Sequence, residues 1–391
     1  MNIGYVNHNG QFSSAGQQSG MTAARPQNIV VIGAGIGGLA AAGMSVTLVE
    51  AQAGPGGKMG SLASVAGPVD AGPTVLTLRG VFDDLFAQAG ERLDNNVTLI
   101  PHATLARHFW TDGCRLDLYA DPQASAAAVA SFAGAKAEAE FVWFNRLSAQ
   151  LYHAFNAPMM QATQPNLPGI LRNTLRNPAI WPALQPNRSL DRQLAKTCTD
   201  PRLRQLIGRY ATDVGGAPDL SPAGLALIWQ AEAQGVWAVQ GGMHRLASAL
   251  ADLAARRGVT LRHGTRAGQI LSKAGRATQV VRSDTRSLKC HSVVFNGDPG
   301  ALLAGRLGQG PQQSLPPSAA HLRSLSAWVW RFAATPSALT LIHHNCFLPA
   351  TRRMNSAPSP KAACLTKLRC TSAPRTAAVE PPQAPNGARL S

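Results

Sequence analysis

Three glycines placed directly after an apolar run carry the clearest chemical signal in the sequence. Asn28–Ile32 reads Asn-Ile-Val-Val-Ile and is followed at once by Gly33-Ala-Gly35-Ile-Gly-Gly38. This spacing, after a strand and before a helix, is typical of a dinucleotide-binding turn. Gly33 permits the tight turn, Gly35 lets the backbone approach a pyrophosphate, and Gly38 lets the helix pack on the strand. The free N–H groups at the start of that helix would bind phosphate oxygens.

An acidic residue at the end of the next apolar run completes this signal. Val46–Val49 predicts a second strand, and Glu50 follows it where a carboxylate would accept the ribose hydroxyls. Strand, turn, helix, strand and acid together favour a dinucleotide site over an accidental glycine-rich turn. However, only about a dozen residues separate Gly38 from Glu50, where about 20 is usual, so the crossover lacks several residues. We expect a helix that supports the sheet poorly and a weakened cofactor affinity.

The elements that must position these residues are read from the apolar periodicity. Repeats of helical type, some of them broken by proline, and short β-branched runs alternate along the chain. Helices are predicted at 81–89, 122–151, 168–177, 190–209 and 243–257, and further strands at 259–262 and 292–295.

Further blocks resemble a known group of flavoproteins. Gly56-Gly57-Lys58-Met59 is similar to the second phosphate-side signature of FAD-binding, amine-oxidase-like proteins, and the block from Gly67 to Thr77 resembles the bacterial phytoene-desaturase family of carotenoid dehydrogenases. Within that family the resemblance is to one branch, the 1-hydroxycarotenoid 3,4-desaturases or methoxyneurosporene dehydrogenases, and it covers about residues 27 to 345. The blocks that carry it lie at 209–216, 227–232, 235–245, 294–299, 326–332 and 343–345.

The resemblance implies an α/β fold in which a Rossmann-like FAD/NAD(P)-binding domain holds an inserted substrate domain of mixed helices and strands. It implies FAD as cofactor. Ala267 stands where relatives have a valine whose backbone contacts adenine. Asp70, Thr74 and Asp298 are candidates for flavin-proximal residues, with a turn or helix-capping role as the alternative. The positions that match the family's cofactor-binding residues are Gly33, Gly35, Gly38, Glu50, Gly57 and Lys58.

The same resemblance divides the chain into six predicted segments. Two parts of the FAD-binding domain flank a substrate and membrane-associated domain, a second substrate-domain segment begins near the end, and both termini are expected to be disordered. Beyond Asn345 the similarity stops and a sequence rich in Pro, Ala and Arg follows, which suggests a truncated or frame-shifted C-terminal portion. The segments are 1–26, 27–80, 81–230, 231–300, 301–345 and the basic tail 346–391.

The implied activity is an FAD-dependent desaturation that introduces the C-3,4 double bond into acyclic 1-hydroxylated carotenoids of the 1-hydroxyneurosporene or methoxyneurosporene type. The resemblance places this step in spheroidene or spirilloxanthin biosynthesis. The difficult step belongs to the flavin, so no catalytic dyad is expected and the catalytic residues stay unknown. Two alternatives remain open: another carotenoid desaturase or isomerase of the same family, and a non-catalytic truncated remnant.

The charge and the cysteine content limit which partners and ligands can be expected. Lys and Arg number 36 against 20 Asp and Glu, a net charge of +16, yet charged residues are only 14% of the chain. The basic stretch from Arg172 to Arg209 is either a solvated face or a membrane-facing patch, because a carotenoid is available only from lipid. No nucleic-acid module accompanies the charge. No metal is expected, since the six cysteines form no C-x-x-C pair.

The predicted location is cytoplasmic, on the surface of the inner, photosynthetic membrane. No apolar signal segment is visible at the N-terminus. The longest apolar stretch, from Ile29 to Met44, is too short to span a bilayer. The sequence leaves the oligomeric state open.

Overall fold

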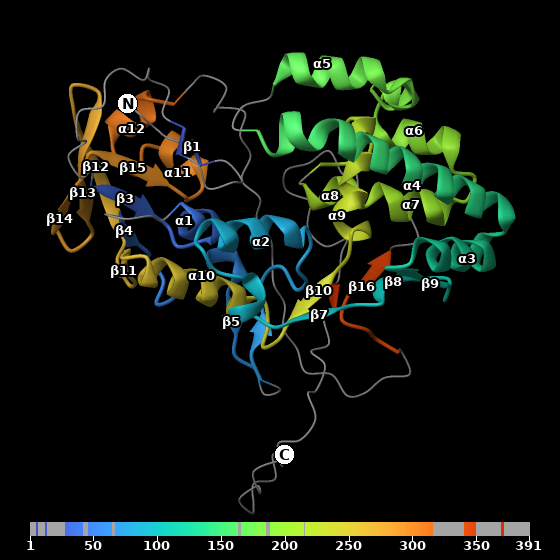
Figure 1. Ribbon diagram of the computed structural model, residues 1–391, viewed down its shortest axis with the longest axis horizontal. Coiled ribbons are helices and arrows are strands. Elements are labelled where there is room, and N and C mark those ends of the chain that lie inside the picture. The colour runs from blue at the N-terminus through green and yellow to red at the C-terminus, as the bar shows by residue number, and fades with distance from the viewer. Residues whose placement is uncertain are drawn as a thin grey trace, which may run out of the picture.

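The computed structural model describes residues 28–41, 46–64, 67–162, 166–184, 188–214, 216–315 and 340–348, together with the backbone of residues 5–6, 12–13 and 369–370. The described chain forms two lobes, one built on a parallel sheet and one mainly helical (Figure 1). Most of the predicted N-terminal extension and basic tail therefore lies outside the described residues. The tail was predicted to begin at residue 346, but Cys346–Leu348 still belongs to strand β16, which pairs with β8.

A parallel sheet forms the centre of the first lobe. Its spatial order is β11-β4-β3-β15, and each neighbouring pair is parallel. In chain order this is third, second, first, fourth, which is the strand order of a Rossmann half-sheet. The predicted Rossmann-like fold is thus confirmed. The strands are β3 Ile29–Ile32, β4 Val46–Val49, β11 Thr260–Arg262 and β15 Ser292–Phe295.

Both faces of this sheet are buried, as expected for parallel strands that read as continuous apolar runs. On one face, Val31 and Leu48 are fully buried in a core that includes Leu246 and Leu250 of helix α10, His244–Arg256. The sheet is therefore held on this side by an amphipathic helix that arrives about 200 residues later in the chain.

The opposite face is covered by a small antiparallel sheet. Val30 and Val49 pack there against Ile270 and Val280. Because successive strand residues point to opposite faces, Val30 and Val31 enter different cores. The covering strands are β12 Ala267–Lys273, β13 Arg276–Arg282 and β14 Ser287–Lys289.

The first crossover helix is as short as the sequence predicts. Helix α1 spans only Ile36–Ala40, which is about 7.5 Å of helix at 1.5 Å per residue. Leu39 is nevertheless buried in the same core as α10. The strands β3 and β4 pair in register from Ile29 opposite Val46 onward. The sheet therefore keeps its pairing beside a helix of little more than one turn.

Two connecting segments run between the lobes. Strand β7, Leu99–Pro101, pairs antiparallel with β10, Trp237–Val239, and Figure 1 shows this pair between the parallel sheet and the helices. Helix α2, Arg79–Gln88, buries Phe86 in the core of the parallel sheet. The predicted domain boundaries at 80 and 230 remain predictions.

The second lobe is a helical layer on a sheet of order β17-β16-β8-β9. Its core contains Phe141, Phe144 and Leu151 of the longest helix, together with Leu118 of the sheet. The elements are β8 Thr104–Trp110, β9 Arg115–Tyr119, β16 Asn345–Leu348, β17 Arg369–Cys370, α3 Pro122–Ala133, α4 Ala135–Phe155, α5 Leu167–Arg176, α6 Leu190–Thr197, α7 Pro201–Gly208, α8 Tyr210–Asp213 and α9 Trp229–Ala233.

Two of the predicted helices are each divided in two. The pattern at 122–151 becomes α3 and α4 because Gly134 adopts φ +89°, a conformation that ends one helix and starts the next. The pattern at 190–209 becomes α6 and α7. Pro201 starts α7, and the carboxylate of Asp200 accepts the N–H groups of Arg202 and Leu203.

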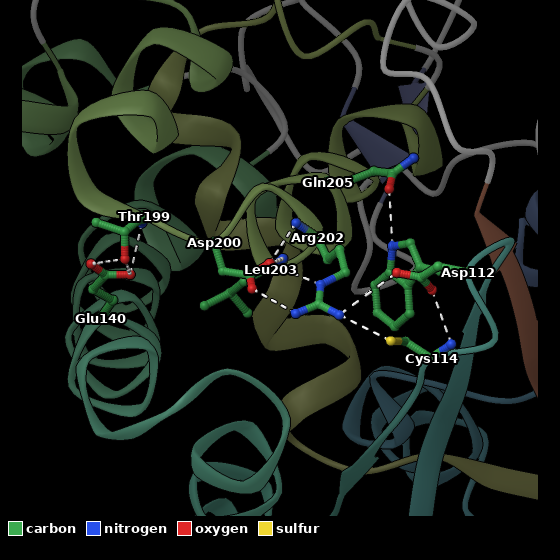
Figure 2. A network of polar contacts seen from close by, with 9 residues as sticks. Asp112, Cys114, Glu140, Thr199, Asp200, Arg202, Leu203 and Gln205 are labelled. Carbon is green, nitrogen blue, oxygen red and sulfur yellow. Dashed lines mark hydrogen bonds and ion pairs between the residues drawn. The ribbon is translucent and has the colours of Figure 1, made fainter.

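A polar network ties these helices to the sheet (Figure 2). The guanidinium of Arg202 reaches Asp200 at 2.9 Å on its own helix and the thiol of Cys114 at 3.0 Å beside strand β9. Nearby, Gln205 accepts the indole N–H of Trp110 at 3.0 Å. The start of α7 is thereby fixed to the β8–β9 hairpin.

The remaining elements are short. No helix in the described part of the chain is long and apolar enough to cross a membrane. The short elements are β1 Tyr5–Val6, β2 Phe12–Ser13, η1 Gly57–Met59, β5 Ser61–Leu62, β6 Val69–Asp70, η2 Leu93–Asn95, η3 Asn156–Met160, η4 Pro178–Ala183, η5 Ala223–Ile228, α11 Pro299–Leu303 and α12 Gln309–Gln313.

Candidate functional site

The glycine turn lies at the carboxyl end of β3, where the order of the strands reverses direction. Gly33 has φ +102° and donates its N–H to the carbonyl of Val49 at 2.8 Å. A Cβ atom added at Gly38 would lie only 2.0 Å from the carbonyl oxygen of Gly33. Both glycines are therefore required by the backbone itself, and the start of α1 is held against the end of β3 as the sequence predicts.

Glu50 lies beside this turn, at the carboxyl end of β4. Its Oε2 accepts the N–H of Ala34 at 2.7 Å, and its Oε1 accepts the N–H of Gln52 at 2.7 Å. The residue is only 8% exposed. An ionised carboxylate has about four acceptor sites, so each oxygen can still accept a hydroxyl. Glu50 can thus fix the turn and bind a ribose at the same time.

Two further predicted segments converge on the same edge of the sheet. The N–H of Gly56 donates to the carbonyl of Ala34 at 2.9 Å, and Gly57, at φ +55°, packs its backbone against Gly35. The N–H of Thr265 donates to the carbonyl of Glu50 at 2.7 Å.

The remaining predicted cofactor-binding residues on these segments, Lys58 and Ala267, lie near this edge. Lys58 follows Gly57 with an exposed side chain, and Ala267 begins β12 two residues after Thr265. The glycine turn, Glu50, the glycine pair and the segment before Ala267 are therefore brought together, although their cofactor contacts remain predictions.

Asn296 is a member of this site that was not among the predicted cofactor-binding residues, although it lies in the matching block at 294–299. It directly follows β15, and its N–H donates to the carbonyl of Ile32 at 2.8 Å. Its side chain packs on the turn. A Cβ added at Gly35 would lie 3.0 Å from Nδ2 of Asn296, and a Cβ added at Gly37 would lie 2.8 Å from its Oδ1. The available signal was a polar residue immediately after a buried parallel strand, at the edge where ligands bind.

Two of the three residues considered flavin-proximal, Asp70 and Asp298, act as helix caps. The Oδ1 of Asp70 accepts the N–H of Met243 at 2.9 Å, at the start of α10. The Oδ1 of Asp298 accepts the N–H of Gly300 at 2.7 Å, at the start of α11. The capping alternative is therefore observed for both, and the cofactor contact predicted for Asp298 remains a prediction.

Thr74, the third such candidate, lies in a polar contact near the junction of the lobes. It is 8% exposed, and its carbonyl accepts a hydrogen bond from Nε2 of His343 at 2.6 Å. The ring of His343 stacks on His102, with centroids 5.0 Å apart. Burial lowers the pKa of His102, and the neighbouring His343 lowers it further. The neutral form of His102 is thereby favoured.

A buried ion pair joins two of the sequence blocks that resemble carotenoid desaturases. Arg209 is 1% exposed, and its Nη2 lies 2.7 Å from the carboxylate of Glu232 and 2.7 Å from the hydroxyl of Tyr210. Burial by itself would lower the pKa of Arg209, but Glu232 together with the neighbouring Tyr210, Cys346 and Asp213 outweighs it, and the pKa is raised. These residues pack inside the helical lobe, so the pair joins α9 to the segment after α7.

The arrangement fits a dinucleotide cofactor. The turn, the carboxylate and the two glycine segments form one edge lined by backbone groups and a single acid. Among the described residues, no group of three or more His, Cys, Asp and Glu side chains could hold a metal ion. The chemistry available at this edge is therefore cofactor binding and orientation, as is expected of a protein whose cofactor performs the reaction.

Comparison with known families agrees with this geometry. Residues 20–330 match the family model described as flavin containing amine oxidoreductase. The matched range includes the glycine turn, Glu50, the glycine pair, Asn296 and most of the helical lobe.

Two curated relatives carry the same printed name, hydroxyneurosporene desaturase. The protein from Cereibacter sphaeroides is 55% identical over 336 residues, which is 84% of this chain and 68% of the relative. The protein from Rhodobacter capsulatus is 48% identical over 337 residues, 85% of this chain and 68% of the relative. The chain thus spans about two thirds of the length of the curated relatives it matches.

A solved structure supports the fold alone. A redesigned putrescine oxidase superposes with a TM-score of 0.51 at 17% identity, covering 75% of this chain and 62% of that one. The identity is too low to transfer a substrate. The likeness agrees with a fold in which a parallel sheet carries an inserted helical lobe.

Proposed function

This chain belongs to the flavin containing amine oxidoreductases, in the branch of the hydroxyneurosporene desaturases, and we propose that it binds FAD and desaturates an acyclic hydroxylated carotenoid. The family and the class of flavin-dependent oxidoreductase predicted from the sequence are therefore confirmed. The FAD form of the flavin, the bond that is desaturated and the pathway are parts of the proposal.

The observation that carries the FAD assignment is Glu50 beside the glycine turn. A dinucleotide has a ribose and a pyrophosphate to place, and this edge offers a carboxylate with spare acceptor capacity next to the N-terminus of a helix. Gly35 would let the backbone approach the pyrophosphate, while Gly33 and Gly38 hold the turn and the helix in place. Gly57 and Lys58 would lie on the second phosphate side of the cofactor. The backbone of Ala267 would contact adenine, and Asp298 would lie toward the flavin.

A bound flavin would accept a hydride from a C–H bond of the substrate, and loss of a proton from the adjacent carbon would complete the carbon–carbon double bond. The protein's own contribution would be orientation and exclusion of water. No side chain is assigned as the acceptor of that proton.

The substrate assignment is supported by the printed name shared by the two relatives. We propose desaturation at C-3,4 of a 1-hydroxylated acyclic carotenoid such as 1-hydroxyneurosporene, on the route to spheroidene or spirilloxanthin. Since the chain spans about two thirds of those relatives, its own turnover is part of the proposal. The proposed location is the surface of the photosynthetic membrane, where a carotenoid is dissolved.

Expression of the full chain in cells that accumulate 1-hydroxyneurosporene tests this function. The expected outcome is a carotenoid with one more double bond, identified by mass and by a longer-wavelength absorption spectrum. The matched control is Gly38→Val, because a side chain there collides with the carbonyl of Gly33 and should abolish flavin binding.

Parallel cultures that accumulate phytoene or non-hydroxylated neurosporene separate the other family activities. Conversion of phytoene instead of the hydroxylated substrate would assign the chain to another desaturase of the family. A purified chain without the flavin absorption band, and no conversion in any culture, would mean a non-catalytic remnant.

A further inference from the structure

Helix α5 carries its largest apolar side chains on the outside of the protein. Leu167, Leu171 and Leu175 are 70%, 60% and 62% exposed. They are spaced four residues apart, so they form one stripe along the helix. In Figure 1, α5 lies along the upper edge of the helical lobe. We call Leu167, Leu171 and Leu175 the leucine stripe.

The other face of α5 fixes this orientation. Gly169 is buried, Ile170 packs against the core of the lobe, and Asn173 donates its side-chain N–H to the carbonyl of Ala154 in α4 at 3.0 Å. Asn166 caps the helix by accepting the N–H of Gly169 at 3.0 Å. A polar residue thus faces inward while leucines face outward, the reverse of the usual surface helix.

Neighbouring side chains extend the apolar surface. Trp181 is 49% exposed and is held beside α5 because its indole N–H donates to the carbonyl of Thr174 at 2.8 Å. Met159, shortly before α5, is 52% exposed. Pro168 lines a shallow groove together with Leu171 and Leu175. Contiguous exposed apolar side chains of this kind mark an interaction surface.

The charged side chains of α5 itself are both basic. Arg172 and Arg176 are exposed and follow two of the leucines by one position. Between Glu140 and Asp191 the sequence contains four arginines and no acidic residue. An occupant of this surface must therefore tolerate, or carry, negative charge.

Part of the basic stretch noted in the sequence is paired with carboxylates within the fold. Arg202 pairs with Asp200, Arg204 with Asp191, and Arg209 is buried with Glu232. These three arginines are already neutralised within the fold. Arg192 and Lys196 are exposed on α6, and Arg172 and Arg176 are exposed on α5 beside the leucine stripe.

We propose that this surface of α5 docks the protein on an anionic lipid bilayer. The leucine stripe and Trp181 would enter the boundary between headgroups and acyl chains, and Arg172 and Arg176 would bind lipid phosphates. A second copy of the chain fits less well, because a two-fold contact would bring the same arginines of both copies together. The inference rests in part on the proposed function, since docking would place the protein where its carotenoid is dissolved.

Vesicle binding by the purified full chain tests the proposal without carotenoid or turnover. We expect co-flotation with phosphatidylglycerol-containing vesicles and weaker binding to phosphatidylcholine alone. L171E/L175E should lower the affinity at least about tenfold, because two charges would enter the apolar boundary. R172Q/R176Q should remove most of the preference for anionic vesicles. The matched control is Leu220→Glu, which adds a charge at a leucine that is 82% exposed outside α5.

The outcomes separate the alternatives. If the native chain does not float, or if L171E/L175E floats as the native chain does, the proposal is overturned. If the native chain is dimeric and L171E/L175E is monomeric without any vesicle binding, a second copy covers the surface instead. Because R172Q/R176Q alters only exposed side chains, it gives an answer even if L171E/L175E fails to fold. A chain that binds vesicles but converts no carotenoid would refute the proposed function and leave this inference standing.

Discussion

Glu50 shows how one side chain can serve both the fold and a cofactor. Its two oxygens each accept a backbone N–H, from Ala34 in the turn and from Gln52 beyond the strand. A side chain that only bound ribose would not need these bonds. The carboxylate therefore sets the geometry of the turn before any cofactor arrives, and its replacement should affect both stability and binding.

Replacing Glu50 tests this double role. Glu50→Ala leaves two N–H groups without their acceptor, so we expect a loss of about 1–3 kcal/mol of unfolding free energy for each one that stays buried. Glu50→Gln retains an acceptor oxygen and should lose less stability, yet bind flavin about tenfold more weakly through loss of charge-assisted bonds. Urea unfolding and flavin fluorescence titration measure the two effects. Equal flavin affinity in all three proteins would contradict the predicted ribose contact.

His102 should make stability depend on pH. Burial and the nearby His343 lower its pKa in the folded protein below the ordinary value of about 6.5. The unfolded chain therefore binds more protons in acid, so the stabilisation is present above about pH 6.5 and is lost as the pH falls through the folded pKa. Melting temperatures from pH 7.5 down to 5 should fall more steeply for the native chain than for His102→Gln. His153→Gln, at an exposed histidine, is the control and should follow the native curve.

At the scale of elements, the pairing of Arg209 with Glu232 shows how distant sequence blocks are joined. The first residue lies at the end of α7 and the second in α9, and the ion pair between them is buried. A buried pair adds little over an apolar contact, but an arginine left without its partner is strongly unfavourable. The resemblance of these blocks to carotenoid desaturases thus has a structural explanation, which is helix docking.

Glu232→Gln should therefore destabilise the helical lobe by about 3–5 kcal/mol, because it leaves the buried Arg209 charge without its closest counter-charge. The matched control is Asp94→Asn, which breaks the exposed pair with Arg79 and should cost within about 1 kcal/mol. Urea unfolding followed by tryptophan fluorescence measures both. Equal losses in the two variants would mean that the pair contributes no more than a surface contact.

The elements themselves were predicted unevenly from sequence. The strands Val46–Val49 and Ser292–Phe295 match their predicted bounds. A β-branched run between turn residues strongly favours a strand with those ends. The helical patterns at 122–151 and 190–209 were too long, since periodicity continues across Gly134 and Pro201 while the backbone does not. Such helix breaks can be predicted only if a glycine or proline is taken to end a helix even where the apolar periodicity continues.

At the scale of the whole molecule, the local part of the candidate site could be predicted and the long-range part could not. The glycine turn and Glu50 lie within one strand–helix–strand unit, so their spacing fixes their geometry. Asn296 joins the site only because β15 inserts beside β3, a pairing of strands more than 250 residues apart. The role of Asp70 as the cap of α10 likewise depends on a contact across 173 residues. Neither contact can be predicted from the apolar periodicity of the sequence.

The two lobes have separate cores, and this predicts how a bound flavin should act on the whole chain. The parallel sheet is buried between two apolar clusters, while the helical lobe has its own. A ligand that binds only the folded site stabilises it by about 2.7 kcal/mol at 100 times its dissociation constant. Because the predicted contacts lie on the sheet, FAD should slow amide exchange in β3, α1 and β4, and leave α3, α4 and α7 almost unchanged.

Hydrogen exchange with mass spectrometry, with and without FAD, measures this difference peptide by peptide. Gly38→Val provides the control, since it should remove the protection of the sheet while the helical lobe exchanges as before. Equal protection of both lobes in the native chain would show that the flavin couples them, as expected if it also lies against the polar contact of Thr74 and His343. Protection of neither lobe would contradict the cofactor site itself, because a bound dinucleotide must hold the turn between β3 and α1.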